Sequence, residues 1–140
     1  MDTMSLSDRV WLGLALALLA LGAGACAQGP ADLSDTSISS RGSAAAGAKV
    51  FQDVGCAACH SAGREFLVGP GMAGMFSAEG PTLMPGVSYK GMLPNARPRT
   101  ETNVAQWIRQ GGQGMMGVMA PQPLDDQRMA DLLAYLRTLE

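Results

Sequence analysis

The chain has 140 residues, with ten basic and twelve acidic side chains that leave a formal net charge of −2. It carries no basic block or stripe that could follow a phosphate backbone, so nucleic-acid binding is excluded as a class, and its length suits a single domain. Aromatic residues make up only 5% of the chain, against 18 glycines, 8 prolines and 10 methionines. Because this composition fills little of an interior, it favours a core completed by a large bound group.

Residues 1–27 have the pattern of a targeting segment. An apolar run, residues 10–22, follows Arg9 and precedes small residues, as in a secretory signal peptide. Three outcomes are open: ordinary cleavage, lipoprotein processing before Cys26, or retention as a membrane anchor. Each predicts an exported domain, periplasmic or on the extracytoplasmic face of the membrane, with a lipid on Cys26 in the second case.

Residues 28–43 are predicted to form a flexible tether. Ser, Asp and Gly dominate this stretch, and its larger apolar residues are only Leu33 and Ile38. The folded domain is therefore expected to cover residues 44–140.

The segment 55–60, GCAACH, brings two cysteines and the chain's single histidine together. A disulfide between Cys56 and Cys59 leaves His60 unexplained. A thioredoxin-like pair requires a preceding strand in βαβ architecture, and a structural zinc site needs a fourth ligand, for which only Cys26 remains. The spacing C-x-x-C-H is typical of covalent haem attachment, in which both thiols become thioethers and the histidine binds iron. We therefore predict one haem c on Cys56 and Cys59, with His60 as an iron ligand.

Residues 100–110, TETNVAQWIRQ, predict an amphipathic helix with Thr100 or Thr102 as its N-cap. The apolar side chains recur at helical spacing: Val104, Trp107 and Ile108. A buried stripe is the simplest interpretation of this pattern.

Residues 111–123, GGQGMMGVMAPQP, predict an irregular loop because glycine and proline interrupt regular structure. The usual sixth ligands of haem iron are Met and His, and the chain has no second histidine. The candidates in this loop are Met115, Met116 and Met119, each of which also suits apolar filling beside a haem.

A final helix is predicted after the loop, with Asp125 as its N-cap. Its expected buried stripe follows helical spacing: Met129, Leu132, Leu133, Leu136 and Leu139.

Over residues 44–140 these patterns resemble the class I c-type cytochromes, small bacterial proteins with one haem. The resemblance implies an all-α cytochrome c fold, with three to four helices and long loops wrapped around one covalently bound haem. Gly47 and Phe51, four residues apart, match a pair that lets the family's first helix cross its last helix closely. Leu132 and Tyr135 would form the matching pair on the last helix.

The resemblance also implies roles for two loop residues. The segment 69–76, GPGMAGMF, is similar to the family's Gly-Pro-x-Leu-x-Gly-Leu-Phe. By that match the carbonyl of Pro70 accepts the ring N–H of His60 and orients the imidazole. Residues 85–89, PGVSY, are similar to a loop whose tyrosine reaches a haem propionate, which implies this role for Tyr89. The alternative is an aromatic ring that covers the haem edge.

Residues 119–124, MAPQPL, resemble the family's distal segment, and this register implies Met119 as the second axial ligand. The proline that commonly follows the ligand is Ala120 here. Trp107 stands twelve residues before Met119, close to the interval at which the family lays an aromatic beneath the ligand.

A haem with both axial positions filled has no open site for a substrate, so we predict an electron carrier and not an enzyme. The rival hypotheses are a peroxidase-like haem enzyme and a gas-binding haem sensor, both with an open sixth site. The expected partners are redox proteins such as membrane oxidoreductases, met by a monomer at the haem edge. An apolar rim is expected there, formed by Ala57, Ala58, Met72 and Met75.

Overall fold

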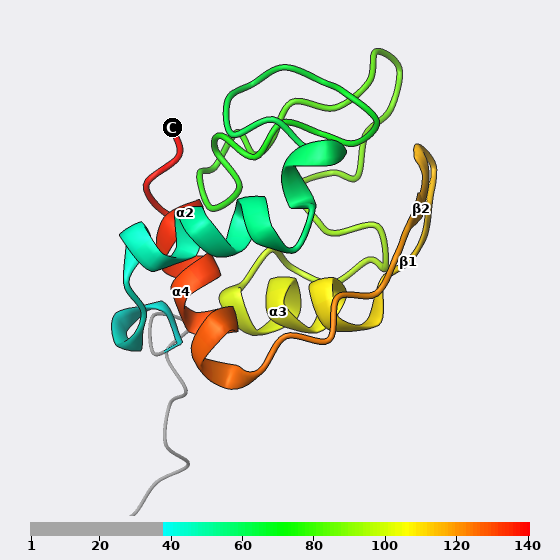
Figure 1. Cartoon of the computed structure of the whole chain (residues 1–140). Coiled ribbons are helices and arrows are strands. Elements are labelled where there is room, and N and C mark those ends of the chain that lie inside the picture. Colours follow the sequence, from blue (N-terminus) through cyan, green and yellow to red (C-terminus); the bar gives the residue numbers. More distant parts are fainter. Residues whose placement is uncertain (1–37) are drawn as a thin grey trace, which may run out of the picture. The chain divides into compact units, whose positions relative to one another are not determined.

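The computed structural model describes residues 38–140, which form three α-helices, two single 3₁₀ turns and one short hairpin (Figure 1). The elements are η2 (Ser39–Arg41), α2 (Ala44–Asp53), η3 (Cys56–Ala58), α3 (Glu101–Gln110), β1 (Gly112–Gly114), β2 (Gly117–Met119) and α4 (Asp126–Leu136). Within this part of the chain the predicted all-α class is confirmed. The targeting segment and residues 28–37 of the tether lie outside the described residues.

Each α-helix begins at a side chain that accepts a hydrogen bond from its first turn. Ser43 caps α2, Thr100 caps α3 and Asp125 caps α4. The two predicted helix starts are therefore confirmed, and Thr100 is chosen over Thr102 as the cap of α3. A capping side chain satisfies one of the backbone N–H groups that a helix start leaves without a partner.

Helices α2 and α4 cross at Gly47. A Cβ at this position would lie 1.9 Å from the carbonyl oxygen of Asp131 and 2.7 Å from Cβ of Tyr135, so only glycine fits. One turn later the rings of Phe51 and Tyr135 meet edge to face, with centroids 5.7 Å apart. The predicted close crossing of the first and last helices is confirmed, although the nearest atoms belong to Asp131 and not to Leu132.

The core lies between these helices and α3. Four of the five residues of the stripe predicted on the final helix are buried in it: Met129, Leu132, Leu133 and Leu136. Leu139 follows the end of α4 and is only partly buried against the core. Among the described residues, no helix combines the length and the apolar character that a membrane crossing requires.

The last residues of the predicted tether, 38–43, are folded against the helices. The backbone N–H of Ser39 donates to Oε2 of Glu101 at 2.9 Å, and its hydroxyl donates to Oε1. The N–H of Ser43 donates to Oδ1 of Asp131 at 2.8 Å. A Cβ at Gly42 would lie 2.1 Å from the carbonyl of Ala130 on α4. The folded region therefore begins at least six residues before position 44.

Residues 112–119 form an antiparallel hairpin, where the sequence predicted an irregular loop. Gly112 pairs with Met119 and Gly114 pairs with Gly117, so that Met115 and Met116 make a two-residue turn. Gly112 and Gly117 have φ values of 151° and 127°, which favour glycine. The same glycines that indicated an irregular loop also permit this hairpin. The backbone pairing of residues 112–114 with residues 117–119 is what distinguishes the hairpin from a loop.

Candidate functional site

A cavity of about 410 Å³ lies beside the core, bounded by α3, the hairpin, α4, the end of α2 and the loops between η3 and α3. Its volume falls in the range of small-molecule and cofactor sites. All seven site residues predicted from the sequence line its wall: Cys56, Cys59, His60, Pro70, Tyr89, Trp107 and Met119. Residues from five separate parts of the chain thus meet around one space.

His60 is held on one side of the cavity by the loop that returns past it. Its Nδ1 donates to the carbonyl oxygen of Pro70 at 2.8 Å, which places the proton on Nδ1 and leaves the Nε2 lone pair available to a metal. A Cβ at Gly69 would lie 2.4 Å from Cε1 of the imidazole, so the backbone of the loop lies directly against the ring. The N–H of Gly69 also donates to the Cys59 carbonyl at 2.9 Å.

The two cysteines lie at either end of the turn η3, which begins after Gly55 in the left-handed conformation (φ 82°). Cys56 is half-buried, Cys59 is exposed, and neither is in a disulfide. Burial raises the pKa of the Cys56 thiol, so in the chain without haem this thiol stays protonated at neutral pH. In residues 38–140 no group of three His, Cys, Asp or Glu side chains is arranged to hold a metal ion, which leaves the zinc interpretation without a ligand set there.

The hairpin separates the three methionine candidates. Met116 and Met119 line the cavity, whereas Met115 does not and is 61% exposed. Met119 is also packed against the core. A Cβ at Gly111 would lie 2.4 Å from the Met119 carbonyl, so α3 ends directly against the backbone of this residue.

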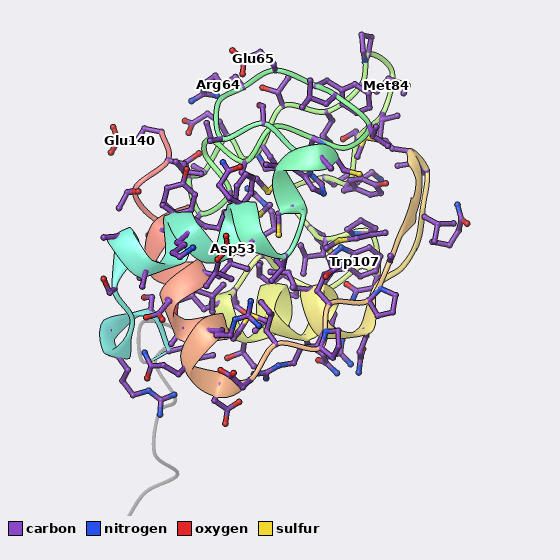
Figure 2. The ribbon with its side chains drawn as sticks, in the orientation of Figure 1. Asp53, Arg64, Glu65, Met84, Trp107 and Glu140 are labelled. Atoms are coloured by element: carbon purple, nitrogen blue, oxygen red, sulfur yellow. The ribbon has the colours of Figure 1, made fainter. Side chains whose placement is uncertain are left out.

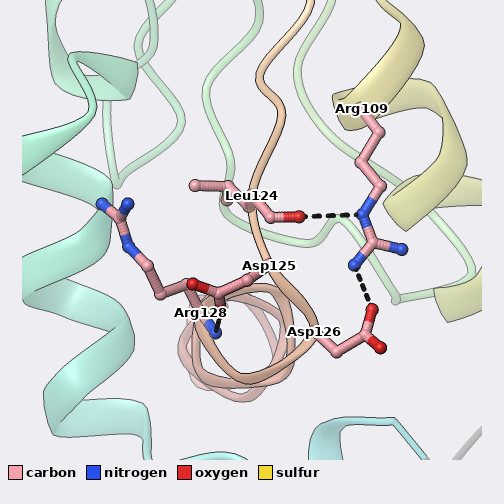
Figure 3. A network of polar contacts seen from close by, with 5 residues as sticks. All are labelled: Arg109, Leu124, Asp125, Asp126 and Arg128. Carbon is pink, nitrogen blue, oxygen red and sulfur yellow. Dashed lines mark hydrogen bonds and ion pairs between the residues drawn. The ribbon is translucent and has the colours of Figure 1, made fainter.

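The chain that follows Met119 is tied to the end of α3. The N–H of Gln122 donates to the carbonyl of Ile108 at 2.8 Å. The guanidinium of Arg109 donates to the Leu124 carbonyl at 3.1 Å and pairs with Asp126, the first residue of α4, at 2.7 Å (Figure 3). These contacts fix the connection between β2 and α4, and they therefore help to hold the backbone of Met119 in its place in the cavity wall.

Tyr89 and Trp107 both contact the hairpin. The hydroxyl of Tyr89 accepts the backbone N–H of Met115 at 2.9 Å, which leaves its own proton free to be donated. Trp107 extends from α3 on the cavity side (Figure 2), and a Cβ at Gly112 would lie 2.7 Å from its ring. Since Gly112 pairs with Met119, the indole lies against the strand next to this methionine. The sequence did not predict that Tyr89 would brace the hairpin.

The predicted apolar rim is wrong in two of its four members. Met72 and Met75 are 7% and 8% exposed and belong to the core, because the loop that carries them folds inward. The large apolar residues exposed on the wall are instead Val68, Met92 and Val118.

Sequence reasoning also missed Arg99, which lines the cavity. A single arginine before a helix cap carries no signal of its own, because its three carbonyl partners come from distant loops. Together with Tyr89 and Lys90 it gives the wall a cationic and hydroxyl-bearing part.

The residues present fit a covalently attached haem. They comprise two thiols, one imidazole with its proton fixed away from the cavity, a thioether on the hairpin and an otherwise largely apolar lining. The cationic part of the wall suits carboxylate substituents.

A family model described as cytochrome c matches residues 44–140. No curated protein sequence matches the chain.

Proposed function

The chain belongs to the cytochrome c family, whose members bind haem c covalently, and we propose that it carries single electrons with iron held between His60 and Met119. Cytochromes c are generally electron carriers. The observation that carries the proposal is the shared cavity. It is lined by the imidazole of His60, by the thioether of Met119 and by both cysteines of the attachment motif.

The geometry of the two axial residues supports this function over chemistry on a substrate. Bound haem supplies a reversible one-electron couple, and two protein ligands leave the metal no open position. His60 is oriented by Pro70 before any ligand binds, and Met119 is held by the backbone contacts at each end of β2. A thioether is a weak donor that favours the ferrous state, so we expect a fairly high reduction potential.

The partners we propose are redox proteins, including membrane oxidoreductases, that meet a monomeric carrier at the exposed wall of the cavity. Val68, Met92 and Val118 present apolar surface there, and a small apolar contact suits a complex that must dissociate quickly. Cytochrome c domains are typically extracytoplasmic. We further propose that the chain is exported and held at the membrane surface by a lipid on Cys26.

Absorption spectroscopy of the purified, oxidised protein tests the ligation. We expect a weak far-red band assignable to a Met–Fe(III) bond, lost in Met119→Ala with a lower potential. Met116→Ala is the matched control, since its side chain lines the same cavity but is less firmly packed, and it should keep the band. A band that disappears in Met116→Ala instead would contradict the assignment.

The two rival functions predict a different wild-type protein. A peroxidase-like enzyme or a gas sensor would lack the far-red band and would bind cyanide or CO readily, whereas the proposed carrier resists both ligands. Mass spectrometry of the mature protein tests the remaining parts of the proposal. It should find one haem added to the chain and a diacylglyceryl group on Cys26 as the first residue.

A further inference from the structure

Arg99 connects the start of α3 to two loops of the cavity wall. It directly precedes Thr100, the cap of α3. Its Nε donates to the carbonyl of Gly91 at 2.9 Å, its Nη1 to that of Met75 at 2.9 Å, and its Nη2 to that of Ala78 at 3.3 Å. The side chain of Arg99 therefore connects residues 75–78 and residue 91 to the N-terminal end of α3.

The packing around this guanidinium is tight. A Cβ at Gly80 would lie 2.3 Å from Nη1 of Arg99, and Gly80 has a φ of 77°, which favours glycine. Arg99, Met75, Gly80 and Gly91 all line the cavity. No helix or β-strand supports this part of the described wall. Its shape is held by turn hydrogen bonds, by the burial of Met75 in the core and by the contacts that Arg99 makes.

Among the described residues, no carboxylate forms an ion pair with Arg99. Its three partners are carbonyl oxygens, and it takes part in none of the ion pairs found within residues 38–140. The acidic residue on the described wall is the exposed Glu79, whose carboxylate interacts electrostatically with both Arg64 and Arg99. A positive charge beside an apolar cavity acts through a low dielectric, and it favours the redox state that carries less positive charge.

We propose that Arg99 is a positioning residue of the redox site with two separable effects. Its forked guanidinium holds the loops at 75–80 and 91 in the shape that encloses the haem, and its charge raises the reduction potential. The inference rests on the proposed electron-transfer function. It assigns a role to a residue outside the attachment motif and outside both axial ligands.

Three variants of the full haem-loaded chain separate the two effects. Arg99→Gln removes the charge and the fork, whereas Arg99→Lys keeps the charge and loses the fork. Arg97→Gln is the matched control, because Arg97 is two residues away, exposed, outside the cavity wall and bonded to Gln106. The measurements are the reduction potential and the hydrogen exchange of the amides of Ser77 and Met92, which close turns in the two loops.

Arg99→Gln should lower the potential at least twice as far as Arg97→Gln, and Arg99→Lys should stay near the wild-type value. Exchange at Ser77 and Met92 should be about tenfold faster in both Arg99 variants and unchanged in Arg97→Gln, as expected for lost hydrogen bonds from a charged donor. Equal potential shifts at positions 97 and 99 would overturn the charge effect. Unchanged amide exchange in Arg99→Lys would overturn the positioning effect. Because this variant keeps the charge, its exchange rates test positioning even if Arg99→Gln does not accumulate as a folded protein.

The same samples keep the two proposals distinct. If the wild-type protein lacks the far-red methionine band, the axial assignment fails while loop exchange still reports on Arg99. If the band is present and the Arg99 variants behave like Arg97→Gln, the electron-transfer function stands and the role of Arg99 is refuted.

Discussion

The helical region of the domain, residues 38–53, 101–110 and 126–140, is held together differently from the loop region, residues 54–100 and 111–125. In the helical region, backbones touch at Gly47, and Glu101 is fully buried between Ser39 and Arg137. The loop region has glycine turns, a short hairpin and the contacts of Arg99 around a cavity. The helices thus stabilise one another largely through their own contacts, whereas the loops enclose space that a cofactor must fill.

Removal of the covalent attachment should have the largest effect. In Cys56→Ala/Cys59→Ala, haem should no longer stay with the chain after acid–organic extraction. The loops should then lose amide protection, for example at Met72 and Ala73, because the group that fills the cavity is no longer bound in place. Far-ultraviolet circular dichroism should fall by a smaller fraction, since the crossing at Gly47 lies outside the cavity wall. Loops that keep their amide protection without haem would show that the cofactor is not needed to hold the loop region in place.

Gly47→Ala tests the backbone contact in the helical region. The added Cβ meets the Asp131 carbonyl, and neither helix can shift without opening the core, so we expect a loss of about 3 kcal/mol in the free energy of unfolding. Gly86→Ala is the control, with a φ of 83° but no atom within 4 Å of the new Cβ. Gly86→Ala should lower the free energy of unfolding by only about 1 kcal/mol, through backbone strain. Chemical denaturation of both variants measures the two losses. Equal losses would mean that the helices do not cross as closely as described.

Glu101→Gln removes the buried charge that Arg137 and Ser39 share. We expect a loss of about 2 kcal/mol in the free energy of unfolding, measured by denaturation, because hydrogen bonds to a charged acceptor are replaced by neutral ones. Asp53→Asn removes a similar charge from an exposed pair with Lys49 and should cost close to nothing. The far-red band should survive both changes, and its loss in Glu101→Gln would tie the two regions together more closely than proposed.

Gly69→Ala is the counterpart of Gly47→Ala in the loop region. Here the new Cβ meets a side chain, the imidazole of His60, and not a helix backbone. The new Cβ would lie 2.4 Å from Cε1 of His60, so the ring should tilt and its hydrogen bond to Pro70 should weaken. We expect a cost of about 1 kcal/mol and a shift in the reduction potential, measured by redox titration. Gly47→Ala should instead leave the potential unchanged. A potential that does not respond to Gly69→Ala would show that the loop does not orient the imidazole.

The smallest effect should come from Glu79, an exposed loop residue. A hydrogen bond from its own backbone, then one from Ser77, lowers the pKa of its carboxyl group below the ordinary value. Its contribution to stability is therefore present above the unfolded-state pKa and is lost as the pH falls through the lowered folded-state pKa. Wild type should be slightly more stable than Glu79→Gln at neutral pH, and the difference should vanish in acid. A stability difference that grows as the pH falls would contradict a lowered pKa for Glu79.

Local patterns in the sequence determined the attachment motif, the cap at Asp125 and most of the stripe on the last helix, and they narrowed the cap of α3 to Thr100 or Thr102. The close approach at Gly47 was implied by the resemblance to the c-type cytochromes. These features depend on residues within one or two helical turns, or on a crossing that only glycine allows. The spacing C-x-x-C-H predicts a haem at Cys56 and Cys59 without reference to any tertiary contact.

Only the tertiary structure decided the hairpin, the docking of residues 38–43 on α4, the burial of Met72 and Met75, and the position of Arg99. Each depends on partners far away in the chain: Met119 for Gly112, Glu101 for Ser39, and two loops for one guanidinium. A glycine-rich segment allows several backbone paths of similar energy, and long-range contacts select one of them. For that reason the six adjacent residues 55–60 predicted the haem attachment, whereas the methionine on the hairpin and the rest of the cavity wall did not follow from any single segment.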